Sequence, residues 1–402
     1  MEEKKLVPKL RFPGFTEPWE QRKFKNFVQI RRGLTYKPSD IASSGIRVLR
    51  SSNINEDQFI TGTNDVFVNI DAVDIPYVKS GDILLTSANG SAHLVGKHAI
   101  INDIVENSAV HGGFMLLVES KNPQFINALL GSNWYKKFIN LYVSGGNGAI
   151  GNLSKSDLEE QDVMFPSEEE QKAIGRVYFY MNHLITLHQR KLEHLKLKKK
   201  SLLQKLFPKE GEVYPELRFP GFTDPWEQRK LKEVVKSYSG GTPTASNKEY
   251  YGGDIPFIRS AEINNDTTEL YITQKGLDNS SAKIVGKGTI LYAMYGATSG
   301  EVGISKINGA INQAILAMLP LNYNAKIIAQ YLRKNKESII GKYLQGGQGN
   351  LSANIILELP IQLPGLEESN QIANFLECYD NLITLHQRKL EHLQLLKKAL
   401  LQ

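Results

Sequence analysis

Apolar and semi-apolar residues recur every three or four positions through a long stretch in the middle of the chain. The stretch begins directly after Pro166, where Ser167 and Glu170 have the spacing of a helix capping box, and it stops before Pro208. We therefore predict one helix over residues 167–206, about 60 Å long at 1.5 Å per residue. The stripe consists of Ile174, Val177, Met181, Leu184, His188, Leu192, Leu195, Leu202 and Leu206.

A second stripe of the same kind closes the chain and predicts a helix over residues 366–402. Both stripes are narrow, and a narrow stripe favours packing against another helix rather than against a broad core. Because the linker over residues 207–216 is short, we expect the two helices to pair in antiparallel fashion. The second stripe consists of Ile372, Phe375, Tyr379, Leu382, His386, Leu390, Leu393 and Leu400.

The segments ahead of the two helices show shorter patterns that predict mixed structure. Gln124–Tyr142 has helical spacing, and loops rich in Ser, Asn and Gly lie at residues 51–55 and 87–91. Such loops commonly carry recognition residues on a rigid frame. Strands are predicted at Ile46–Leu49, Ile83–Leu85, Phe114–Val118, Ile255–Ile258, Thr289–Tyr292 and Ala314–Leu319.

The chain repeats itself with a period of about 200 residues. Residues 184–195 and 382–393 are the same twelve residues, and residues 10–23 return at 217–230 with only Glu17 changed, to Asp224. The aromatic and turn-forming residues of the segments 10–23 and 217–230 predict a packed strap rather than a helix or a regular strand. We call these two segments the straps.

The globular segments between the repeats have diverged, and only faint correspondence survives. The corresponding pairs are 46–51 with 255–260, 81–84 with 288–291, 145–147 with 346–348, and 152–154 with 350–352. One fold used twice with different loops suits a reader of two different DNA half-sites.

Together these patterns predict an α+β protein built as a pseudo-twofold tandem duplication. Two mixed α/β domains are expected to be held apart by the two long antiparallel helices, paired as a coiled coil. The expected parts are a first domain at 1–166, a first helix at 167–206, a linker at 207–216, a second domain at 217–365 and a second helix at 366–402.

Charge and composition favour an acidic partner. The net charge is +6 and the pI is near 9.0, which points to nucleic acid first. One cysteine, Cys378, excludes an internal disulfide framework, and its place on an apolar stripe predicts a small buried core residue. The charged first ten residues and the lack of a long apolar run predict a cytoplasmic protein without a membrane span.

Signatures of catalysis are mostly missing from the sequence. It contains no phosphate loop ending in Gly-Lys-Ser/Thr and no His-Glu-x-x-His. Gly146-x-Gly148-x-x-Gly151 matches a dinucleotide pattern by letter, but a flexible turn is the favoured interpretation. Residues 74–77 and 254–257 are similar to the Asp-Pro-Pro-Tyr/Phe element of amino-methyltransferases, but both lack its first proline. A self-contained DNA methyltransferase stays the enzymatic alternative.

Histidine and lysine clusters have a structural interpretation beside a functional one. His188 and His194 are six residues apart on a helix, so they face different sides and form no metal pair. His93, His98 and His111 lie in or near polar loops, where DNA contact and an ordinary surface role are both open. The run 198–200 is three lysines, which form a solvated helix face or contact phosphates between two half-sites.

Basic and amide side chains in the loops carry the main functional signal. Arg and Lys read guanine edges and neutralise phosphates, while Asn and Gln can pair with adenine. We expect the DNA-binding residues among Arg31, Arg32, Tyr36, Lys37, Arg47, Arg50, Ser52, Asn53, Asn89, Ser91, His93, Ser239, Thr242, Thr244, Asn247, Lys248, Tyr250, Arg259, Glu262, Asn264, Tyr295, Thr298, Ser299 and Gln348.

Two globular segments are each closed by a long helix that opens with Glu-Glu, at 169–170 and 367–368. The second half further contains Gly240-Gly241-Thr242-Pro243, the run at residues 253–258 and Asn312-Gln313. By these features the chain resembles, over essentially its whole length, the specificity subunit of type I restriction-modification systems. The first half departs from the pattern: residues 33–35 are Gly-Leu-Thr, and His111-Gly112 stands where the second half has Asn312-Gln313.

The resemblance implies a non-catalytic reader of DNA. Its two target recognition domains would bind the halves of an asymmetric, bipartite sequence in double-stranded DNA, with the helices as a ruler for the gap. The implied partners are two modification (methyltransferase) subunits, which methylate adenine with S-adenosylmethionine, and restriction (translocase and endonuclease) subunits, which use ATP and Mg. No cofactor is expected in this chain. The third hypothesis is a scaffold whose coiled coil joins other proteins.

Overall fold

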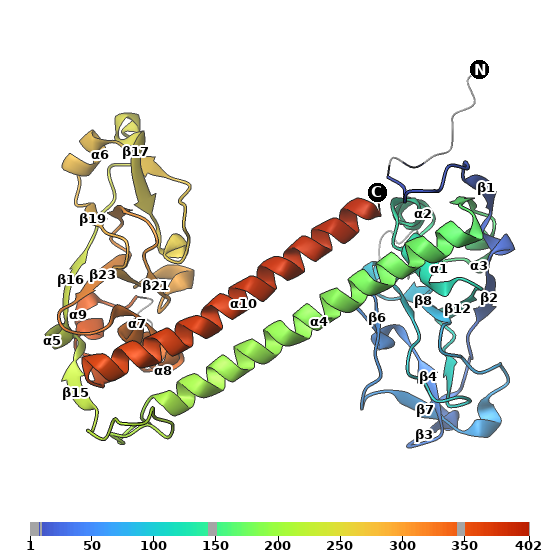
Figure 1. Cartoon of the computed structure of the whole chain (residues 1–402), viewed down its shortest axis with the longest axis horizontal. Helices are drawn as coiled ribbons and strands as arrows, with labels where there is room; N and C mark the ends of the chain where they lie inside the picture. Colours follow the sequence, from blue (N-terminus) through green and yellow to red (C-terminus); the bar gives the residue numbers. More distant parts are fainter. Residues whose placement is uncertain (1–7, 9, 144–150, 344–349, 402) are drawn as a thin grey trace. The chain divides into compact units, whose positions relative to one another are not determined.

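The computed structural model describes residues 8, 10–143, 151–343 and 350–401 (Figure 1). By internal contacts the chain divides into a first unit, residues 1–189 and 388–402, and a second unit, residues 190–387. Both dividing lines fall at the same place in the repeated twelve residues, between Gln and Arg. Each long helix therefore contributes one part to each unit. The predicted domain boundaries at residues 166 and 365 stay a prediction.

The first unit is built on two four-stranded sheets, with strand orders β10-β8-β12-β2 and β11-β4-β7-β3. The first sheet is antiparallel, whereas β4 and β11 in the second sheet run parallel. The strands are β2 (Gln29–Arg32), β3 (Ile41–Ala42), β4 (Ile46–Leu49), β7 (Val66–Val68), β8 (Ile83–Thr86), β10 (His98–Ile100), β11 (Ala109–His111) and β12 (Met115–Glu119). Two-stranded pairs are β1 (Glu20–Lys23) with β14 (Asp162–Phe165), β5 (Ile54–Asn55) with β6 (Gln58–Phe59), and β9 (Ala88–Asn89) with β13 (Gly151–Asn152).

Strand β8 is buried on both faces, which its unbroken apolar sequence Ile-Leu-Leu predicts. Ile83 and Leu85 pack with the helices α1 (Pro123–Leu130) and α2 (Asn133–Tyr142), and Leu84 packs in a separate cluster on the other face. The prediction of a single helix over 124–142 is wrong: α1 ends at Leu130 and α2 begins after Ser132. The spacing continues across this break, so periodicity alone could not reveal it.

The second unit repeats this plan. Its sheets have the orders β16-β23-β20-β21 and β18-β17-β22-β19, and β17 and β22 run parallel as β4 and β11 do. The strands are β16 (Val235–Ser239), β17 (Tyr251–Ile258), β18 (Tyr271–Ile272), β19 (Lys283–Val285), β20 (Ile290–Ala293), β21 (Val302–Ile304), β22 (Gly309–Ile311) and β23 (Ile315–Pro320), with β15 (Glu227–Lys230) paired to β24 (Pro360–Leu363). Shorter helices are α3 (Lys155–Glu159) in the first unit and α5 (Leu231–Val234), α6 (Gln274–Asp278), α7 (Ala325–Lys334), α8 (Lys336–Tyr343) and α9 (Ala353–Leu357) in the second.

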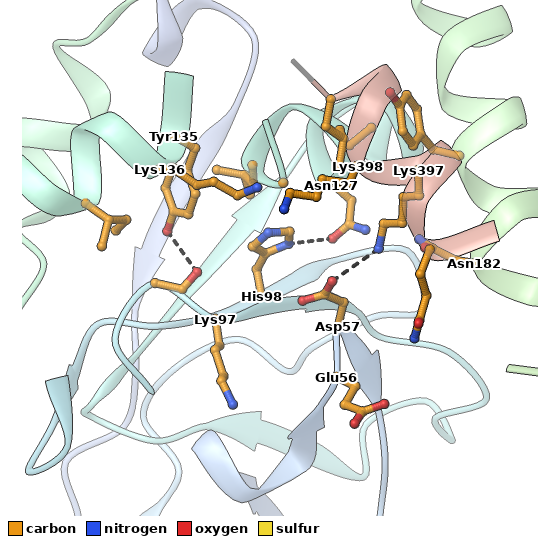
Figure 2. A pocket seen from close by; sticks show the side chains of 18 of the residues that line it. Glu56, Asp57, Lys97, His98, Asn127, Tyr135, Lys136, Asn182, Lys397 and Lys398 are labelled. Carbon is orange, nitrogen blue, oxygen red and sulfur yellow. Dashed lines mark hydrogen bonds and ion pairs between the residues drawn. The ribbon is translucent and has the colours of Figure 1, made fainter. Parts of the chain in front are cut away.

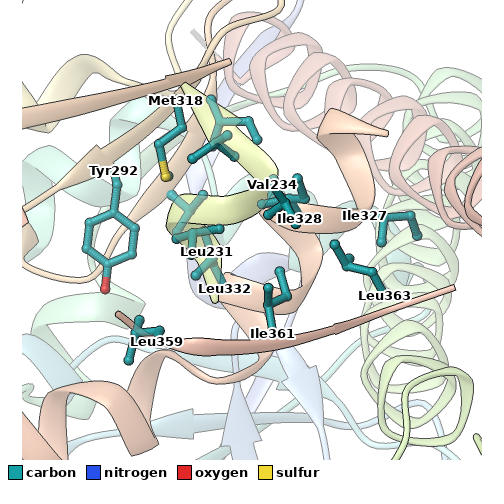
Figure 3. Packing of buried hydrophobic residues seen from close by; sticks show 14 of the residues in the cluster. Leu231, Val234, Tyr292, Met318, Ile327, Ile328, Leu332, Leu359, Ile361 and Leu363 are labelled. Carbon is teal, nitrogen blue, oxygen red and sulfur yellow. The ribbon is translucent and has the colours of Figure 1, made fainter. Parts of the chain in front are cut away.

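One large apolar cluster holds the second unit together. Figure 3 shows Leu231 and Val234 of α5 with Ile327, Ile328 and Leu332 of α7 and the strand residues beside them. Phe207, assigned to the linker by sequence, is 0% exposed in this cluster and stacks edge-on against Trp226 at 5.5 Å. The start of the linker is therefore part of the core of this unit.

Both predicted long helices are confirmed, as α4 (Glu168–Leu206) and α10 (Leu366–Leu400). The Ser167 hydroxyl accepts a hydrogen bond from the backbone N–H of Glu170 at 3.4 Å, as a capping residue does. In the second unit, Lys199 of α4 forms an ion pair with Asp380 of α10 at 2.5 Å. Leu206 lies further along α4 in the same cluster as Ile372, which comes earlier in α10, so the two helices run antiparallel there.

The seam along α4 differs in part from the predicted stripe. Its inward positions follow a heptad through Tyr178, Met181, Ile185, Leu192 and Leu195, all at most 8% exposed. The predicted stripe residues Leu184 and Leu382 are instead 41% and 43% exposed, because a mixed three-and-four spacing also admits the next position along the helix. Cys378, expected in the core, is exposed on α10.

The straps are each tied to a long helix by a buried ion pair. Arg11 donates two hydrogen bonds to Glu170, at 2.8 and 2.7 Å, and Arg218 donates two to Glu368, at 2.8 and 2.9 Å. The expectation that the straps form no regular strand is wrong at their ends, since residues 20–23 and 227–230 form β1 and β15. The duplicated strap and helix sequences are thus partners in packing. No helix in the described part of the chain has the length and apolar character needed to cross a membrane.

Candidate functional site

The predicted loop residues of the first unit gather where the strands β4 and β11 end. Because these strands are parallel and His111 is in register with Leu49, the segments that follow them leave the sheet side by side. The N–H of Gly112 donates to Leu49 O at 2.8 Å, and the N–H of Leu34 donates to His111 O at 2.7 Å. The N–H groups of residues 87 and 88 both donate to Phe114 O. We call residues 33–37, 50–53, 87–91 and 112–114 the first edge.

The second unit builds an equivalent edge with the same hydrogen-bond framework. Ile311 of β22 is in register with Ile258 of β17, and the N–H of Gly241 donates to Ile311 O at 3.2 Å. The N–H of Met294 donates to Ala314 O at 2.8 Å. We call residues 240–244, 259–262, 294–299 and 312–314 the second edge.

This framework corrects the correspondence expected from the sequence. The backbone partners make His111 the structural equivalent of Ile311. Gly112-Gly113, and not His111-Gly112, therefore stands where the second unit has Asn312-Gln313. The correspondence of residues 152–154 with 350–352 is confirmed: Leu153 N–H donates to Ser87 O and Leu351 N–H to Met294 O. The glycine pairs at 145–146 and 346–347, most of the Gly146-x-Gly148-x-x-Gly151 pattern and the predicted site residue Gln348 lie outside the described residues.

In the first edge a 3₁₀ turn, residues 51–53, follows β4 and fixes the backbone of Arg50. Asn53 is 1% exposed; its Oδ1 accepts the Arg50 N–H at 2.8 Å and its Nδ2 donates to Asp65 at 2.8 Å and to Ile60 O at 3.0 Å. The Asn53 amide could meet a DNA base only if these bonds broke. Ser52 beside it is exposed.

In the second edge the equivalent turn, residues 260–262, uses a carboxylate where the first uses an amide. Glu262 is 7% exposed and accepts from the Arg259 N–H at 3.0 Å and from the Arg259 guanidinium at 3.0 and 2.9 Å. Burial alone would raise the pKa of Glu262, but the hydrogen bonds from Arg259 and from the Glu269 N–H outweigh it and lower that pKa to about 2. The carboxylates of Glu262 and Glu269 in turn raise the pKa of Arg259.

The two edges therefore carry different charge. Arg259 is neutralised by Glu262 and by Glu269, which it meets at 2.6 Å. Arg50 bonds to the backbone carbonyl of Asn64 at 3.2 Å, and its turn supplies an amide instead of an acid. Within the described residues, the first edge thus presents an arginine that no carboxylate pairs with, whereas the second presents an arginine held by its own acids.

The remaining basic residues of the first unit fall into two groups. Arg31 pairs with Glu119 at 2.7 Å, and Arg47 pairs with Asp65 at 2.9 Å. Both arginines therefore form ion pairs within the fold. Arg32 and Lys37 are exposed, and no carboxylate of the described residues forms an ion pair with either.

The other predicted residues of the first edge lie as follows. Tyr36 is half-buried against the apolar cluster beneath the edge. Asn89 donates to the Ser51 hydroxyl at 3.0 Å and accepts from the Ser91 N–H at 2.9 Å, so its loop is tied to the turn after β4. Ser91 and His93 are exposed.

His98 and His111 lie at strand ends near polar loops, as expected, but the surface role expected for them is wrong. His111 is 0% exposed, and burial lowers its pKa to about 4. His98 is 6% exposed, its Nδ1 lies 2.9 Å from Asn127 Oδ1, and burial likewise lowers its pKa. His98 is the first residue of the short strand β10 and His111 is the last residue of β11, and the polar loops beside these strands obscure them in the sequence.

A hydroxyl and amide cluster occupies the middle of the second edge. The Thr242 hydroxyl donates to Gln313 Oε1 at 2.6 Å, and the Tyr295 hydroxyl donates to Gln313 O at 2.6 Å. Gln313 belongs to the Asn312-Gln313 pattern but was missing from the predicted site residues. Ser299 is 8% exposed and donates to Met294 O at 3.0 Å, and Thr298 beside it is half-buried.

The last predicted residues lie around this cluster. Asn247 caps the 3₁₀ turn of residues 248–250, since its side chain accepts the Glu249 N–H at 3.1 Å. Asn264 lies beyond the second edge, where its Oδ1 is 3.5 Å from an Arg333 nitrogen. Thr244 and Lys248 are exposed, while Ser239, at the end of β16, and Tyr250 are half-buried. Whether each of these residues meets DNA stays a prediction.

Away from the first edge, the first unit contains a pocket of about 840 Å³ (Figure 2). It is lined by the domain, by α4 and by the last turns of α10, and the carbonyl oxygen of Leu401, directly after α10, accepts the Asn133 N–H at 3.1 Å. Lys397 reaches into it and pairs with Asp57 at 3.2 Å. These contacts attach the end of α10 to the first unit.

The equivalent positions of the second unit carry different side chains. In the second unit the equivalent lysine, Lys199, pairs with Asp380, but the first unit has Asn182 at the position of that aspartate. Gly131 directly follows α1 and lines the pocket, whereas Arg333 lies in the last turn of α7 and donates to Val302 O at 2.9 Å. Across the described residues, no three histidine, cysteine or carboxylate side chains cluster so as to hold a metal ion.

Two matches to one family model account for most of the sequence. The model is described as the type I restriction modification DNA specificity domain, and it matches residues 16–197 and 223–395. The chain belongs to this family. Each match ends within one of the long helices and includes one edge, so the family pattern contains both the loops and the repeat.

Specificity subunits of type I restriction enzymes are similar to this chain along its length. A Methanocaldococcus jannaschii protein provisionally named the MjaX specificity subunit is 26% identical over 402 residues, covering 96% of this chain and 92% of the relative. The MjaIX specificity subunit of the same organism is 31% identical over 180 residues, 42% of this chain and 41% of its own length. The EcoR124I/EcoR124II specificity subunit of Escherichia coli is 26% identical over 184 residues, 43% and 42% of the two chains.

Solved structures show the same fold. The crystal structure of a type I restriction-modification S subunit from M. genitalium has a TM-score of 0.62 at 15% identity and covers 98% of both chains. A chain from a structural description of complex assembly in the type I system has a TM-score of 0.51 at 17% identity, again with 98% of both chains covered. As a member of this family, the chain is a sequence-specific DNA recognition subunit.

Proposed function

We propose that each unit reads one half of a bipartite target in double-stranded DNA, the first with its first edge and the second with its second edge. The observation that carries this is the pair of edges itself: one hydrogen-bond framework presents different side chains in the two units. A framework kept while its exposed groups diverge is what two readers of different sequences require. The target is therefore asymmetric.

Phosphate contact is assigned to the basic residues whose charge no acid of the described chain neutralises. Among the predicted site residues of the first unit these are Arg32, Lys37 and Arg50, and in the second unit Lys248 is exposed. Each phosphate contact releases counterions, so binding weakens steeply as salt rises. The paired residues Arg31 and Arg47 are assigned to positioning the strands instead.

We propose further that the chain binds two modification subunits and restriction subunits. The supporting observation concerns the twelve repeated residues, which are identical even at positions the fold does not bury. Leu184 and Leu187 are 41% and 54% exposed, and their copies Leu382 and Leu385 are 43% and 46% exposed. Two identical apolar faces suit two copies of one protein partner.

In this proposal the chain itself is not catalytic and holds no cofactor. Adenine methylation with S-adenosylmethionine, and restriction with ATP and Mg, belong to the partner subunits. The chain's task is to hold the DNA while a partner turns the target base out of the duplex.

Methylation mapping of a genome tests the proposal. Cells that carry this chain and its modification partner are compared with cells in which this chain alone is deleted. We expect N6-methyladenine at one motif, two short halves around an unspecified gap, and its loss in the deletion. If no motif changes, the chain does not direct methylation and a scaffold becomes the better explanation. Methyl transfer by the purified chain alone would instead support an enzyme.

A further inference from the structure

The two edges also differ at a second equivalent turn, which joins β11 to β12 and β22 to β23. The turn is Gly112-Gly113-Phe114 in the first unit and Asn312-Gln313-Ala314 in the second. Residues 115 and 315 both donate their N–H back across the turn, to residues 112 and 312, at 2.8 and 3.3 Å. The two turns therefore have the same backbone and exchange an apolar tip for a polar one.

In the first unit the turn presents a phenyl ring on a fixed backbone. Phe114 is 70% exposed, yet its carbonyl accepts two hydrogen bonds, from the N–H groups of Ser87 and Ala88 at 2.9 and 3.1 Å. The glycines before it have no side chains to cover the ring. A Cβ on Gly113 would lie 3.2 Å from Thr35 Oγ1, and one on Gly112 would lie 3.8 Å from Arg50 Cγ. The turn that carries the ring therefore packs against Thr35 and Arg50 of the first edge.

In the second unit the turn presents an oriented amide. Gln313 is exposed. Its side-chain oxygen Oε1 accepts a hydrogen bond from the Thr242 hydroxyl, and its backbone oxygen accepts one from the Tyr295 hydroxyl. The Nε2 group has no acceptor within the described residues. The held Oε1 keeps a second lone pair, so the side chain can donate and accept at once.

We propose that these two turns are the base-reading tips of the two half-sites, with Phe114 packing on the 5-methyl group of a thymine and Gln313 pairing with an adenine. This rests on the proposed function. A phenyl group recognises thymine through its methyl group, and glutamine can pair with adenine at N6 and N7 in the major groove. The half-site read by the first unit contains a thymine that the tip specifies, and the other half-site contains an adenine.

The test compares motifs mapped for the chain with those for Phe114→Ala and Gln313→Ala, co-expressed with the modification partner. We expect Phe114→Ala to lose about tenfold in discrimination at one thymine of one half-site, and Gln313→Ala to lose about tenfold at one adenine of the other. Val105→Ala, which removes a side chain that is 74% exposed outside the edge, and Gln228→Ala, at an exposed position of β15, are the matched controls. The unaltered half-site in each variant shows that the chain still folds.

A second measurement isolates the methyl group. Oligonucleotides in which uracil replaces the specified thymine are bound by the complex with the original chain and with Phe114→Ala. The original chain should bind the uracil duplex about tenfold more weakly than the thymine duplex, and the variant should not distinguish them. Equal binding of both duplexes by the original chain would overturn the thymine contact.

The outcomes separate this inference from the proposed function. A mapped motif that neither variant changes would overturn the assignment of the tips and leave the chain a DNA reader. If the original chain directs no motif at all, the proposed function itself fails. Transplanting the tip by Gly113→Gln with Phe114→Ala should replace the thymine requirement by a different base in the first half-site alone.

Discussion

At the scale of single residues, sequence order predicts where polar side chains lie but not what they bind. Asn53 and Glu262 were both placed correctly in loops that follow a strand. Their burial depends on segments further along the chain, since Asn53 bonds to Asp65 and Glu262 to the backbone of Glu269. Such partners are fixed by the tertiary fold, so the loops alone could not show that these side chains are occupied.

The same limit hid Gln313 and Phe114 as readers. Phe114 was taken as the first residue of a strand, but β12 begins at Met115, and the ring is left exposed at the turn. A comparison of the two halves by their strand ends would have placed it opposite Ala314. The two glycines before Phe114 do not match Asn312-Gln313 in sequence, so sequence alone did not reveal this alignment.

The buried His111 predicts how the stability of the protein depends on pH. Burial lowers the pKa of His111 to about 4, against about 6.5 in the unfolded chain. The unfolded state therefore binds a proton first, so the stabilising effect is complete above about pH 6.5 and is lost as the pH falls toward 4. Up to about 3 kcal/mol is lost over that window.

The measurement is the free energy of unfolding against pH for the chain and for His111→Gln. The variant should lose about one proton's worth of slope between pH 6.5 and 4, whatever its stability at neutral pH. His93→Gln, which removes an exposed histidine, should leave the slope as it is. An equal slope for all three chains would show that His111 is not buried neutral.

At the scale of elements, periodicity predicted type and length but not the fine register. The helix α4 begins and ends within one residue of the prediction. The prediction nevertheless joined α1 and α2 and chose Leu184 for the seam where the structure uses Ile185. Two neighbouring apolar residues, such as Leu184 and Ile185, can both fit the heptad spacing. The sequence alone does not decide which of them faces inward, because packing against the partner helix selects it.

The leucines that the seam leaves out give the second prediction. Leu184→Ser with Leu187→Ser removes one of the two identical apolar faces, and we expect a purified complex with one modification subunit instead of two. Serines at Leu382 and Leu385 as well should leave none. The mass of the co-expressed complex, measured by native mass spectrometry, decides between these states.

The control is Leu141→Ser, which removes a leucine that is 76% exposed on α2, outside the repeat. It should leave two modification subunits bound. A complex that keeps both subunits with all four leucines replaced would show that the partners dock elsewhere.

At the scale of the whole molecule, the duplication was the part that the sequence predicted best. It gave two equivalent folds, and the structure places the division between the units at the same bond of each repeat. What the duplication could not predict is where the copies differ in space. Gly131 and Asn182 line the pocket of the first unit, whereas in the second unit Arg333 donates to Val302 O and Asp380 pairs with Lys199.

The long helices give the last prediction, because their seam has a period of seven residues. Residues 189–195 and 387–393 are identical, so a second copy of these seven can be inserted after Leu195 and after Leu393 without breaking the heptad. Each helix then lengthens by about 10.5 Å, which corresponds to about three base pairs. We expect the mapped motif to keep both half-sites and to gain about three unspecified base pairs between them.

The matched control is an insertion of the same seven residues into one helix only. The two seams then differ in length, so the helices cannot keep their pairing in both units, and we expect the motif to be lost rather than lengthened. An unchanged gap in the double insertion would mean that something other than the helices sets the distance between the half-sites. A changed half-site would mean that the inserted segment alters the edges themselves, which no residue of the repeat contributes to in this structure within its described part.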